Sequence, residues 1–302
     1  MISTHQNPEG DAIGATLALA LALESLGKTV RVLTQDPVPE VLAFLPGAEK
    51  ITHQAPPDGR FDIAFSVDCG DRPRLGEEFN KVKGIAKIIN IDHHVSNDFF
   101  GDLNLVDPGA SSAAEIIYGL IRTLPAPFTK EVAENIYTGI LTDTGSFHYS
   151  NTSARTFSAA RACLLAGVDP WKVAQKVYDT QPLSRLRLLP RVLDTLEFSA
   201  DGRVSSVAVT QQMLKEAGAI VAMTEDFINF PRSVQGVEVA LLFREVTPEK
   251  YRVSMRSRGA VDVARIAGKF QGGGHPAASG CTLEGNFSIV KAKILEAVRA
   301  VL

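Results

Sequence analysis

The sequence predicts an α/β protein, in which a mainly parallel N-terminal sheet with helices on both faces precedes a smaller C-terminal α+β domain. Short apolar runs alternate with helical segments through the first 180 residues, as in parallel sheets with crossover helices. Beyond Glu197 the pattern changes to a hairpin, paired strands and a glycine-rich stretch. We expect domains at 1–180 and 197–302, a connecting helix at 181–196, and an active site in the cleft between the two domains.

The expected elements of the first domain begin with a strand and a buried helix. The helix AIGATLALALALESLG contains Glu24 and follows no basic segment, so it is neither a signal peptide nor a membrane span. The expected strands are ISTH, TVRVLT, DIAFSVD, AKIINID and LNLVD. Further helices are expected at 111–124, 130–142, 153–166 and 170–179.

The expected elements of the second half begin with QPLSRLRLLPRVLDTLEFS, a connecting helix entered through Pro182 and bent near Pro190. LEFSADGRVSSVAVT predicts a hairpin with its turn at Asp201 and Gly202. The helix QQMLKEAG, the strands GVEVALLFRE and YRVSMRS, a glycine-rich loop and the helix SIVKAKILEAVRAV follow.

The composition limits the partners and the compartment. The formal net charge of −3 argues against a protein that tracks long nucleic acid, because such proteins neutralise many phosphates. Three widely separated cysteines, without a CxxC pair, argue against a zinc ribbon or a disulfide framework and suit the cytoplasm. We expect no membrane association and no long duplex partner, and a homodimer stays open.

Carboxylates and imidazoles follow the expected strands and one helix. In open α/β sheets, ligands bind beyond the carboxyl ends of the strands. Four separate segments bring such side chains to this rim: His5, Glu9 and Asp11; Asp68; Asp92, His93 and His94; and Asp143. Oxygen and nitrogen ligands without thiolate suit manganese, iron, cobalt, magnesium or zinc. Six or seven such groups exceed what one ion needs, so we expect two divalent cations that share a carboxylate, clamp a phosphoryl group and generate a hydroxide nucleophile.

Each of these residues also has an ordinary structural explanation. A lone aspartate after a strand, such as Asp68, is commonly a turn former, and Asp11 stands where a helix cap would stand. The joint occurrence of four such segments favours the metal site.

Five ordered motifs resemble those of the DHH phosphoesterase superfamily with its DHH-associated C-terminal domain. They are HQNPEGDAIG, VDCGD, DHH, TDTGSF and QGGGHPAASG, and they cover nearly the whole chain. Length and the GGGH run single out the nanoRNase and pAp phosphatase type within that superfamily. This resemblance implies hydrolysis of short oligoribonucleotides from an end and removal of the 3′-phosphate of adenosine 3′,5′-bisphosphate (pAp).

The resemblance also implies roles for the residues of the rim. His5 and Glu9 would hold one metal, Asp11, His93 and Asp143 the other, and Asp68 would bridge the two. His94 would contact the scissile phosphate or protonate the leaving oxygen, and Asp92 would orient a histidine. The metals are expected to be Mn²⁺, with Mg²⁺ or Co²⁺ as alternatives.

The sequence departs from the family motifs at two positions, one near each end of the chain. Glu9 stands where the family has Asp, and its longer side chain leads us to expect a weaker or differently coordinated first metal. Gln271 stands where another glycine is common. The remaining GGGH allows backbone N–H groups to approach a phosphate closely. The expected substrate-binding residues are Arg256, Arg258, Gly272, Gly273, Gly274 and His275.

Two alternatives stay open at this point. The first is a phosphodiesterase of the same superfamily that acts on cyclic dinucleotides or on linear pApA. The second, favoured by Glu9 alone, is a nucleotide-binding regulator with an impaired metal site.

Overall fold

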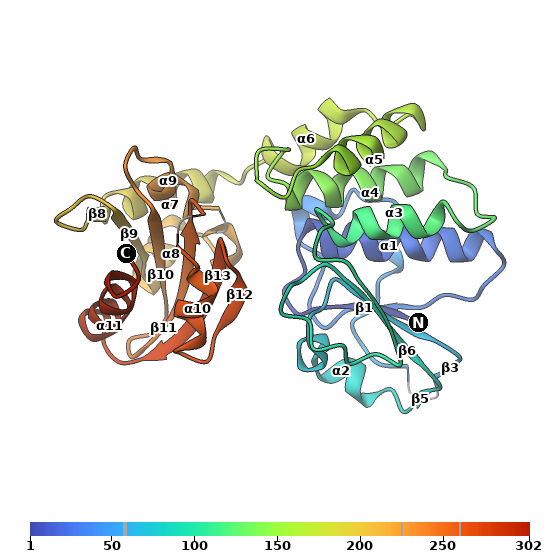
Figure 1. Cartoon of the computed structure of the whole chain (residues 1–302), viewed down its shortest axis with the longest axis horizontal. Helices are drawn as coiled ribbons and strands as arrows, with labels where there is room; N and C mark the ends of the chain where they lie inside the picture. The colour runs from blue at the N-terminus through green and yellow to red at the C-terminus, as the bar shows by residue number, and fades with distance from the viewer. Residues whose placement is uncertain (57–58, 225, 260) are drawn as a thin grey trace. The chain divides into compact units, whose positions relative to one another are not determined.

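A computed structural model describes residues 1–56, 59–224, 226–259 and 261–302, and the chain divides into two units. These units are Met1–Thr180 and Gln181–Leu302. Each has its own sheet and its own buried core (Figure 1).

The main sheet of the first unit is parallel throughout, with strand order β2-β1-β4-β6-β7. Its strands are β1 (Ile2–Thr4), β2 (Val32–Leu33), β4 (Ala64–Val67), β6 (Ile88–Asp92) and β7 (Leu103–Val106). Only two residues of the expected strand TVRVLT pair in this sheet. β2 lies on one side of β1 and the later strands lie on the other, so the strand order reverses at β1. Ligands bind at such a reversal in open α/β sheets.

Helices cover both faces of this sheet, as the sequence predicts. The helices are α1 (Gly10–Ser25), α2 (Gly76–Lys81), α3 (Ala113–Ile121), α4 (Lys130–Asp143), α5 (Ala154–Leu165) and α6 (Pro170–Tyr178). α1 is buried along most of its length, because α3 and α4 pack against it. A Cβ on Gly14 would lie 2.4 Å from the backbone oxygen of Asn135, so this close approach of α1 to α4 requires glycine. On the opposite face, Phe79 of α2 packs with Leu75 and Ile88.

Short elements complete the first unit. They are the paired strands β3 (Arg60–Phe61) and β5 (Gly84–Ile85) and the 3₁₀ helices η1 (Glu40–Leu42), η2 (Ala48–Lys50) and η3 (Arg72–Leu75).

The second unit has a mixed sheet with strand order β12-β13-β11-β10-β9-β8. Its elements are α7 (Leu183–Leu193), β8 (Glu197–Phe198), β9 (Val204–Val209), α8 (Gln211–Ala217), η4 (Val221–Thr224), α9 (Asn229–Ser233), β10 (Val239–Thr247), β11 (Lys250–Ser257), α10 (Val263–Gly268), β12 (Gly273–His275), β13 (Ala278–Glu284) and α11 (Phe287–Arg299). β9 and β10 are parallel, and the other pairs are antiparallel. One face packs against α10 and α11, the other against α7 and α8.

The glycine-rich segment is an edge strand, and the expectation of a loop was wrong. Gly273–His275 form β12, which pairs with β13. The glycines permit this pairing because the backbones come very close. A Cβ on Gly272 would lie 2.2 Å from the backbone oxygen of Gly280, and Gly274 has a left-handed φ of 135°.

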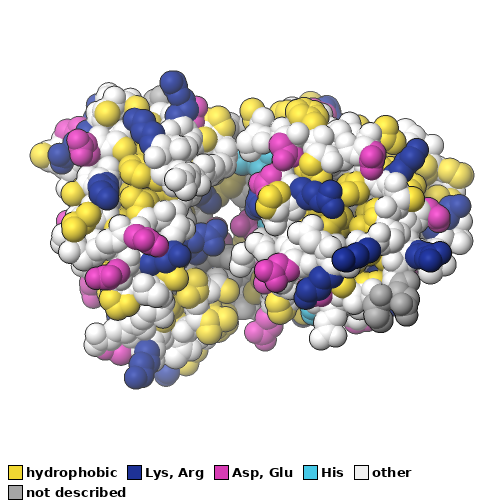
Figure 2. Space-filling view, turned by 90° about the horizontal axis from the view of Figure 1, so that it is seen from below, with side chains coloured by type: hydrophobic (Ala, Val, Ile, Leu, Met, Phe, Trp, Pro, Cys, Tyr) yellow, Lys and Arg dark blue, Asp and Glu magenta, His cyan; other side chains and the backbone are white. Residues whose placement is uncertain are grey.

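Charges of both signs are mixed on the described surface that faces the viewer in Figure 2. Figure 2 shows Lys and Arg side chains interspersed with Asp and Glu on this face. Among the described residues, no helix is both long enough and apolar enough to cross a membrane.

Candidate metal centre

The centre of the rim is the imidazole of His93, which follows β6. Its Nε2 lies 3.4 Å from Oδ1 of Asp68, which follows β4. Two further carboxylates, Asp143 at the end of α4 and Asp11 in the first turn of α1, lie 3.7 and 3.9 Å from the same nitrogen. Segments far apart in the chain thus place three carboxylates around one imidazole. Ligand atoms of Asp11, His93 and Asp143 lie close enough together to hold one cation.

His5 lies near the other carboxylate oxygen of Asp68. Its Nε2 lies 3.5 Å from Oδ2 of Asp68, and both side chains are buried. Its Nδ1 lies 2.8 Å from the backbone oxygen of Gln6, which can only accept, so Nδ1 carries a proton. This hydrogen bond turns the other ring nitrogen, Nε2, towards Asp68 and makes it the ligand atom when the ring is neutral.

Asp68 occupies the middle of the cluster and has an uncommon backbone conformation. Its φ is 55°, in the left-handed region that Asp tolerates better than most residues. Its N–H donates to the backbone oxygen of Ile91, which ties the turn to the neighbouring strand. Backbone strain of this kind costs stability and recurs at functional sites.

Asp11 has a structural role in addition to its position beside His93. Its carboxylate accepts hydrogen bonds from the backbone N–H groups of Ala113 and Ala114, at 2.6 and 2.8 Å. These are orphan donors at the start of α3, where negative charge is favoured. Asp11 therefore bonds α1 to α3, and its carboxylate also lies beside His93.

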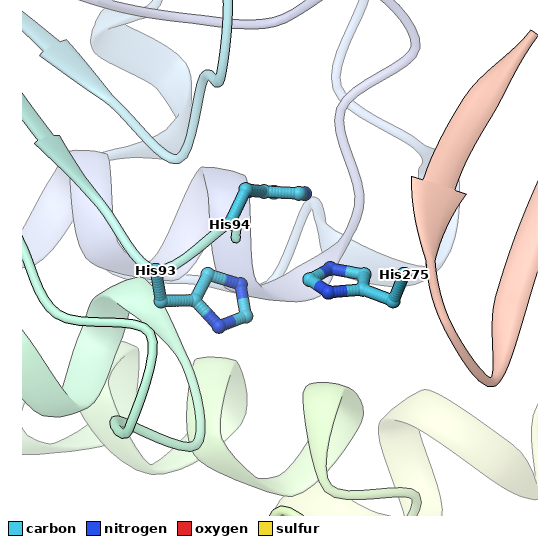
Figure 3. Close-up of side chains that lie close together, drawn as sticks. All are labelled: His93, His94 and His275. Carbon is cyan, nitrogen blue, oxygen red and sulfur yellow. The ribbon is translucent and has the colours of Figure 1, made fainter. Parts of the chain in front are cut away.

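His94 belongs to a separate chain of hydrogen bonds. Figure 3 shows His93 and His94 side by side where β6 ends; their ring centroids lie 4.9 Å apart. Nδ1 of His94 lies 2.7 Å from Oδ1 of Asp92, which is fully buried. Oδ2 of Asp92 accepts from Nδ2 of Asn97 at 2.6 Å, and the same amide nitrogen lies 2.8 Å from Oδ1 of Asn90.

Asn97 and Asn90 were missed by the sequence interpretation. Both are buried, and Nδ2 of Asn90 donates to the backbone oxygen of Cys69 at 3.0 Å. The available signal was the polar residue inside the apolar run AKIIN, together with an asparagine five residues after Asp92. Buried polar side chains need partners, and Asn97 finds one of its partners in Asp92, which in turn bonds His94.

The pKa values of the carboxylates show how strongly they interact. Burial and the carboxylates of Asp68 and Asp143 raise the pKa of Asp11 well above its ordinary value. Burial also raises the pKa of Asp143, to about 6; Asp68 and Glu9 add to this rise and His93 opposes it. Burial acts upwards on Asp68 too, but the imidazoles of His5, His93 and His94 hold its pKa well below the ordinary range.

The imidazoles respond in the opposite direction. Burial opposes the charged form of His93, but Asp68, Asp143 and Asp11 outweigh it and raise its pKa to about 10. Burial likewise opposes protonation of His5, and the hydrogen bond and charge of Asp68 overcome it, so its pKa lies above the ordinary value. The negative charge of these buried carboxylates thus needs compensation, which a cation or bound protons can supply.

The donor set fits divalent cations. Oδ1 of Asp68 is buried and accepts no hydrogen bond within the described part of the chain, although such atoms normally have a partner. Around it stand imidazole nitrogens and carboxylate oxygens, the ligands that Mn²⁺, Zn²⁺ and related ions take. His5 with Asp68 could hold one ion, and Asp11, Asp68, His93 and Asp143 could hold another.

Glu9 is not brought into this cluster. It precedes α1 as its N-cap residue, its side chain is exposed, and it makes no capping hydrogen bond. Its negative charge nevertheless contributes to the raised pKa of Asp143.

The predicted substrate-binding residues all lie in the second unit. Gly273, Gly274 and His275 form β12, Gly272 precedes it, and Arg256 is half-buried on β11. His275 is drawn on β12 in Figure 3. The guanidinium of Arg258 donates to the backbone oxygens of Arg232 and Ser233, at 3.0 and 3.2 Å. Arg258 therefore stabilises the end of α9, whatever else it contacts.

A parallel sheet that gathers carboxylates and imidazoles at its carboxyl edge, followed by a second α+β unit, defines a metal-dependent hydrolase of phosphate esters. Residues 1–140 match the family model "DHH family, N-terminal domain", and residues 205–302 match the DHHA1 domain. The chain belongs to the DHH family of phosphoesterases, and the resemblance found in its sequence motifs is confirmed.

Named relatives extend over nearly the whole chain. The bifunctional oligoribonuclease and PAP phosphatase NrnA of Thermus thermophilus is 37% identical over 302 residues, which is 99% of this chain and 88% of that protein. The probable bifunctional oligoribonuclease and PAP phosphatase NrnA of Streptococcus mutans is 31% identical over 282 residues, covering 93% of this chain and 88% of that protein.

Solved structures with this architecture include an exopolyphosphatase-related protein from Bacteroides fragilis. Its TM-score is 0.90 at 30% identity, with 99% of this chain and 91% of that chain covered. A putative family II inorganic pyrophosphatase from Methanococcus jannaschii, at 15% identity and a TM-score of 0.50, shares the fold alone; 99% of each chain is covered.

Proposed function

We propose that this protein hydrolyses short oligoribonucleotides from an end and removes the 3′-phosphate of pAp. The observation that carries the proposal is the cluster around Asp68, where carboxylates and imidazoles from four segments of the chain meet. Two relatives whose names contain both activities support the choice of substrates.

In this proposal the rim holds two divalent cations, preferably Mn²⁺. His5 and Asp68 hold one, and Asp11, His93 and Asp143 hold the other together with Asp68. Glu9 reaches the first site only after its side chain turns, which makes that site the weaker one. Bound cations supply charge neutralisation for the phosphoryl oxygens and lower the pKa of a water molecule.

Contact with the scissile phosphate and protonation of the leaving oxygen are assigned to His94. Its Nδ1 donates to Asp92, so Nε2 is the ring atom proposed to contact the scissile phosphate. When His94 is protonated, Nε2 can give its proton to the leaving oxygen, and Asp92 stabilises the positive ring. Asn97 keeps the Asp92 carboxylate oriented for this exchange.

Substrate binding is assigned to residues 197–302 and catalysis to residues 1–180. The backbone N–H groups of Gly272, Gly273 and Gly274, with Arg256 and His275, are proposed to bind the nucleotide at the end of the substrate. We place the protein in the cytoplasm, where its substrates arise and where its three buried cysteines stay reduced.

The test is an assay with Mn²⁺ on pAp, on an RNA ladder of two to seven nucleotides and on a cyclic dinucleotide. We expect phosphate release from pAp and shortening of the ladder, with both lost in EDTA. Turnover of the cyclic dinucleotide alone would establish the alternative phosphodiesterase instead.

The exposed position of Glu9 favours one second candidate, a nucleotide-binding regulator with an impaired first metal site. Under that alternative the wild-type chain binds pAp without turnover, and Glu9→Asp gains activity. Under the main proposal the wild-type chain turns over, and Glu9→Asp changes mainly the Mn²⁺ concentration at half-maximal rate.

A further inference from the structure

The first unit contains a cavity at the edge of its main sheet that lies opposite the candidate metal centre. The volume of the cavity is about 570 Å³, which is usual for sites that hold small molecules. Its lining includes Arg31, whose backbone oxygen accepts from the N–H of Ile2 in β1 at 2.8 Å. The cavity therefore lies beside the amino end of β1, whereas His5 follows the carboxyl end of the same strand.

Helix α1 connects the candidate metal centre with this cavity. Asp11 in its first turn lies beside His93, and Glu24 near its end lines the cavity. The helical rise between these two positions amounts to about 20 Å. Among the described residues that line the cavity, none belongs to the candidate metal centre, so the cavity is a separate site.

The interior of the cavity is apolar. Leu17 and Ala20 of α1 and Val32 of β2 line it and are buried, so they form its floor. Leu21 and Phe61 also line it and are half-buried. A ligand group that covers these side chains removes apolar surface from water, and this favours the binding of an apolar group.

The opening of the cavity is cationic. Arg31 before β2, Lys50 in η2 and Arg60 in β3 belong to its lining, and all three are exposed. Nζ of Lys50 lies 2.7 Å from Oε2 of Glu24, the one carboxylate among the described lining residues. In the described part of the chain, the guanidinium groups of Arg31 and Arg60 form no ion pair. The positive charge at the opening therefore exceeds the negative charge.

We propose that this cavity binds a phosphate monoester that carries a flat apolar group, with the apolar group inside and the phosphate at Arg31 and Arg60. A phosphate monoester has a charge of about −1.5 to −2 at pH 7, which matches two guanidinium groups. Arginine can bind phosphate oxygens through two parallel hydrogen bonds, and the ring of Phe61 offers a flat surface to the organic group. This site is additional to the proposed catalytic centre and does not depend on it.

The test measures binding of 1-naphthyl phosphate to the full chain by fluorescence anisotropy of the naphthyl group. EDTA is present throughout, so that no cation at the metal centre holds the phosphate. We expect saturable binding by the wild type. The dissociation constant should be about tenfold higher in the double variant Arg31→Gln/Arg60→Gln, because charge-assisted hydrogen bonds to the phosphate are lost.

The matched control is Arg161→Gln, because this exposed arginine lies on α5 and does not line the cavity. Its dissociation constant should stay within about twofold of that of the wild type, as for most surface substitutions. All of these arginines are exposed, so their variants should keep the fold, and circular dichroism checks this.

Two further comparisons test the apolar half of the site. Ala20→Leu places a larger apolar side chain in the floor of the cavity and changes no charge, so we expect it to weaken binding of 1-naphthyl phosphate about tenfold. 1-Naphthol lacks the phosphate and inorganic phosphate lacks the ring, and each should bind the wild type about tenfold more weakly, or worse, than 1-naphthyl phosphate. These probes also decide the matter if Ala20→Leu does not fold.

Three results overturn the inference. The first is an equal affinity of the wild type and the double arginine variant for 1-naphthyl phosphate. The second is equal binding of 1-naphthol and 1-naphthyl phosphate, which would mean that the cations contribute nothing. The third is loss of binding in Arg256→Gln but not in the double variant, which would place the probe in the second unit. A failure of the proposed function appears differently, as absent turnover of pAp by the wild type in Mn²⁺.

Discussion

The two units treat charge in opposite ways. In the first, Asp11, Asp68 and His93 are buried close together at the carboxyl edge of the parallel sheet, and their pKa values are strongly displaced. In the second, Arg244 and Arg252 stand on a half-open sheet face. Buried charges need compensation at short range, whereas exposed ones are screened by water and salt.

This difference in burial decides which surface suits cation binding and which suits contact with a flexible substrate. A buried cluster gives strong, directional interactions with a cation, and it costs stability when its charges are not matched. An exposed face gives weak contacts that add along a flexible substrate. Variants at the rim should therefore act on kcat and stability, and variants on the sheet face should act on KM.

The largest expected effect is that of Asp68→Asn. Because Asp68 lies between His5 and His93, its loss removes the proposed bridging ligand, and we expect kcat on pAp to fall by about a thousandfold or more. Activity at saturating Mn²⁺ measures kcat, and circular dichroism checks that the variant is folded. Asp107→Asn is the matched control, because Asp107 also follows a strand but pairs with Arg155 at the surface. Wild-type turnover in Asp68→Asn would refute the metal assignment.

The second effect is stabilisation by the cation. Mn²⁺ at a hundred times its dissociation constant should raise the free energy of unfolding by about 2.7 kcal/mol, because it binds only the folded state. Thermal melts in EDTA and in Mn²⁺ measure the shift. The shift should shrink in Asp68→Asn and persist in Asp107→Asn. Equal shifts in all three proteins would place Mn²⁺ elsewhere on the surface.

The third effect concerns Asn97, which orients Asp92 and through it His94. We expect Asn97→Ala to lower kcat on pAp by about 10–100-fold with little change in KM, as for other residues that hold a catalytic group in place. Asn104→Ala is the control, since Asn104 makes local hydrogen bonds with Gly101 at the surface. A change in KM alone would contradict a positioning role.

The smallest effect separates two adjacent glycines. Gly273→Ala should leave the melting temperature unchanged and raise the KM for pAp several-fold, because its Cβ would enter open space where the backbone is proposed to bind the nucleotide. Gly272→Ala should instead destabilise the protein, since its Cβ would clash with the backbone of Gly280. Steady-state kinetics and thermal melts on both variants distinguish the two. Parallel losses of stability would contradict the comparison.

The sequence predicted the parallel sheet well because its strands are apolar runs that end in polar residues. The helix expected at 130–142 and the strand LNLVD match α4 and β7 to within one residue, and the strands DIAFSVD and AKIINID contain β4 and β6 but begin two residues too early. The strand TVRVLT was overestimated, because only Val32 and Leu33 pair with β1. Periodicity describes which residues can be buried, and it does not say how much of an edge strand finds a neighbour.

The gathering of His5, Asp11, Asp68, His93 and Asp143 was also predictable, since each follows an element that ends at one edge of the sheet. The exposed position of the Glu9 side chain could not be predicted, because the direction of a side chain in a loop leaves no pattern in the sequence. Asn97 and Asn90 were missed for a related reason. Their role depends on hydrogen bonds that only the folded chain defines.

Asp11 has a consequence for how this protein can change over time. Its carboxylate holds the first N–H groups of α3 while it faces His93. A substitution that removes the carboxylate proposed to hold a metal at Asp11 also removes a helix cap, which commonly costs about 1 kcal/mol. Descendants of this chain that lose catalysis should therefore tend to keep Asp11. An aspartate there, taken alone, is poor evidence that a related chain is still an enzyme.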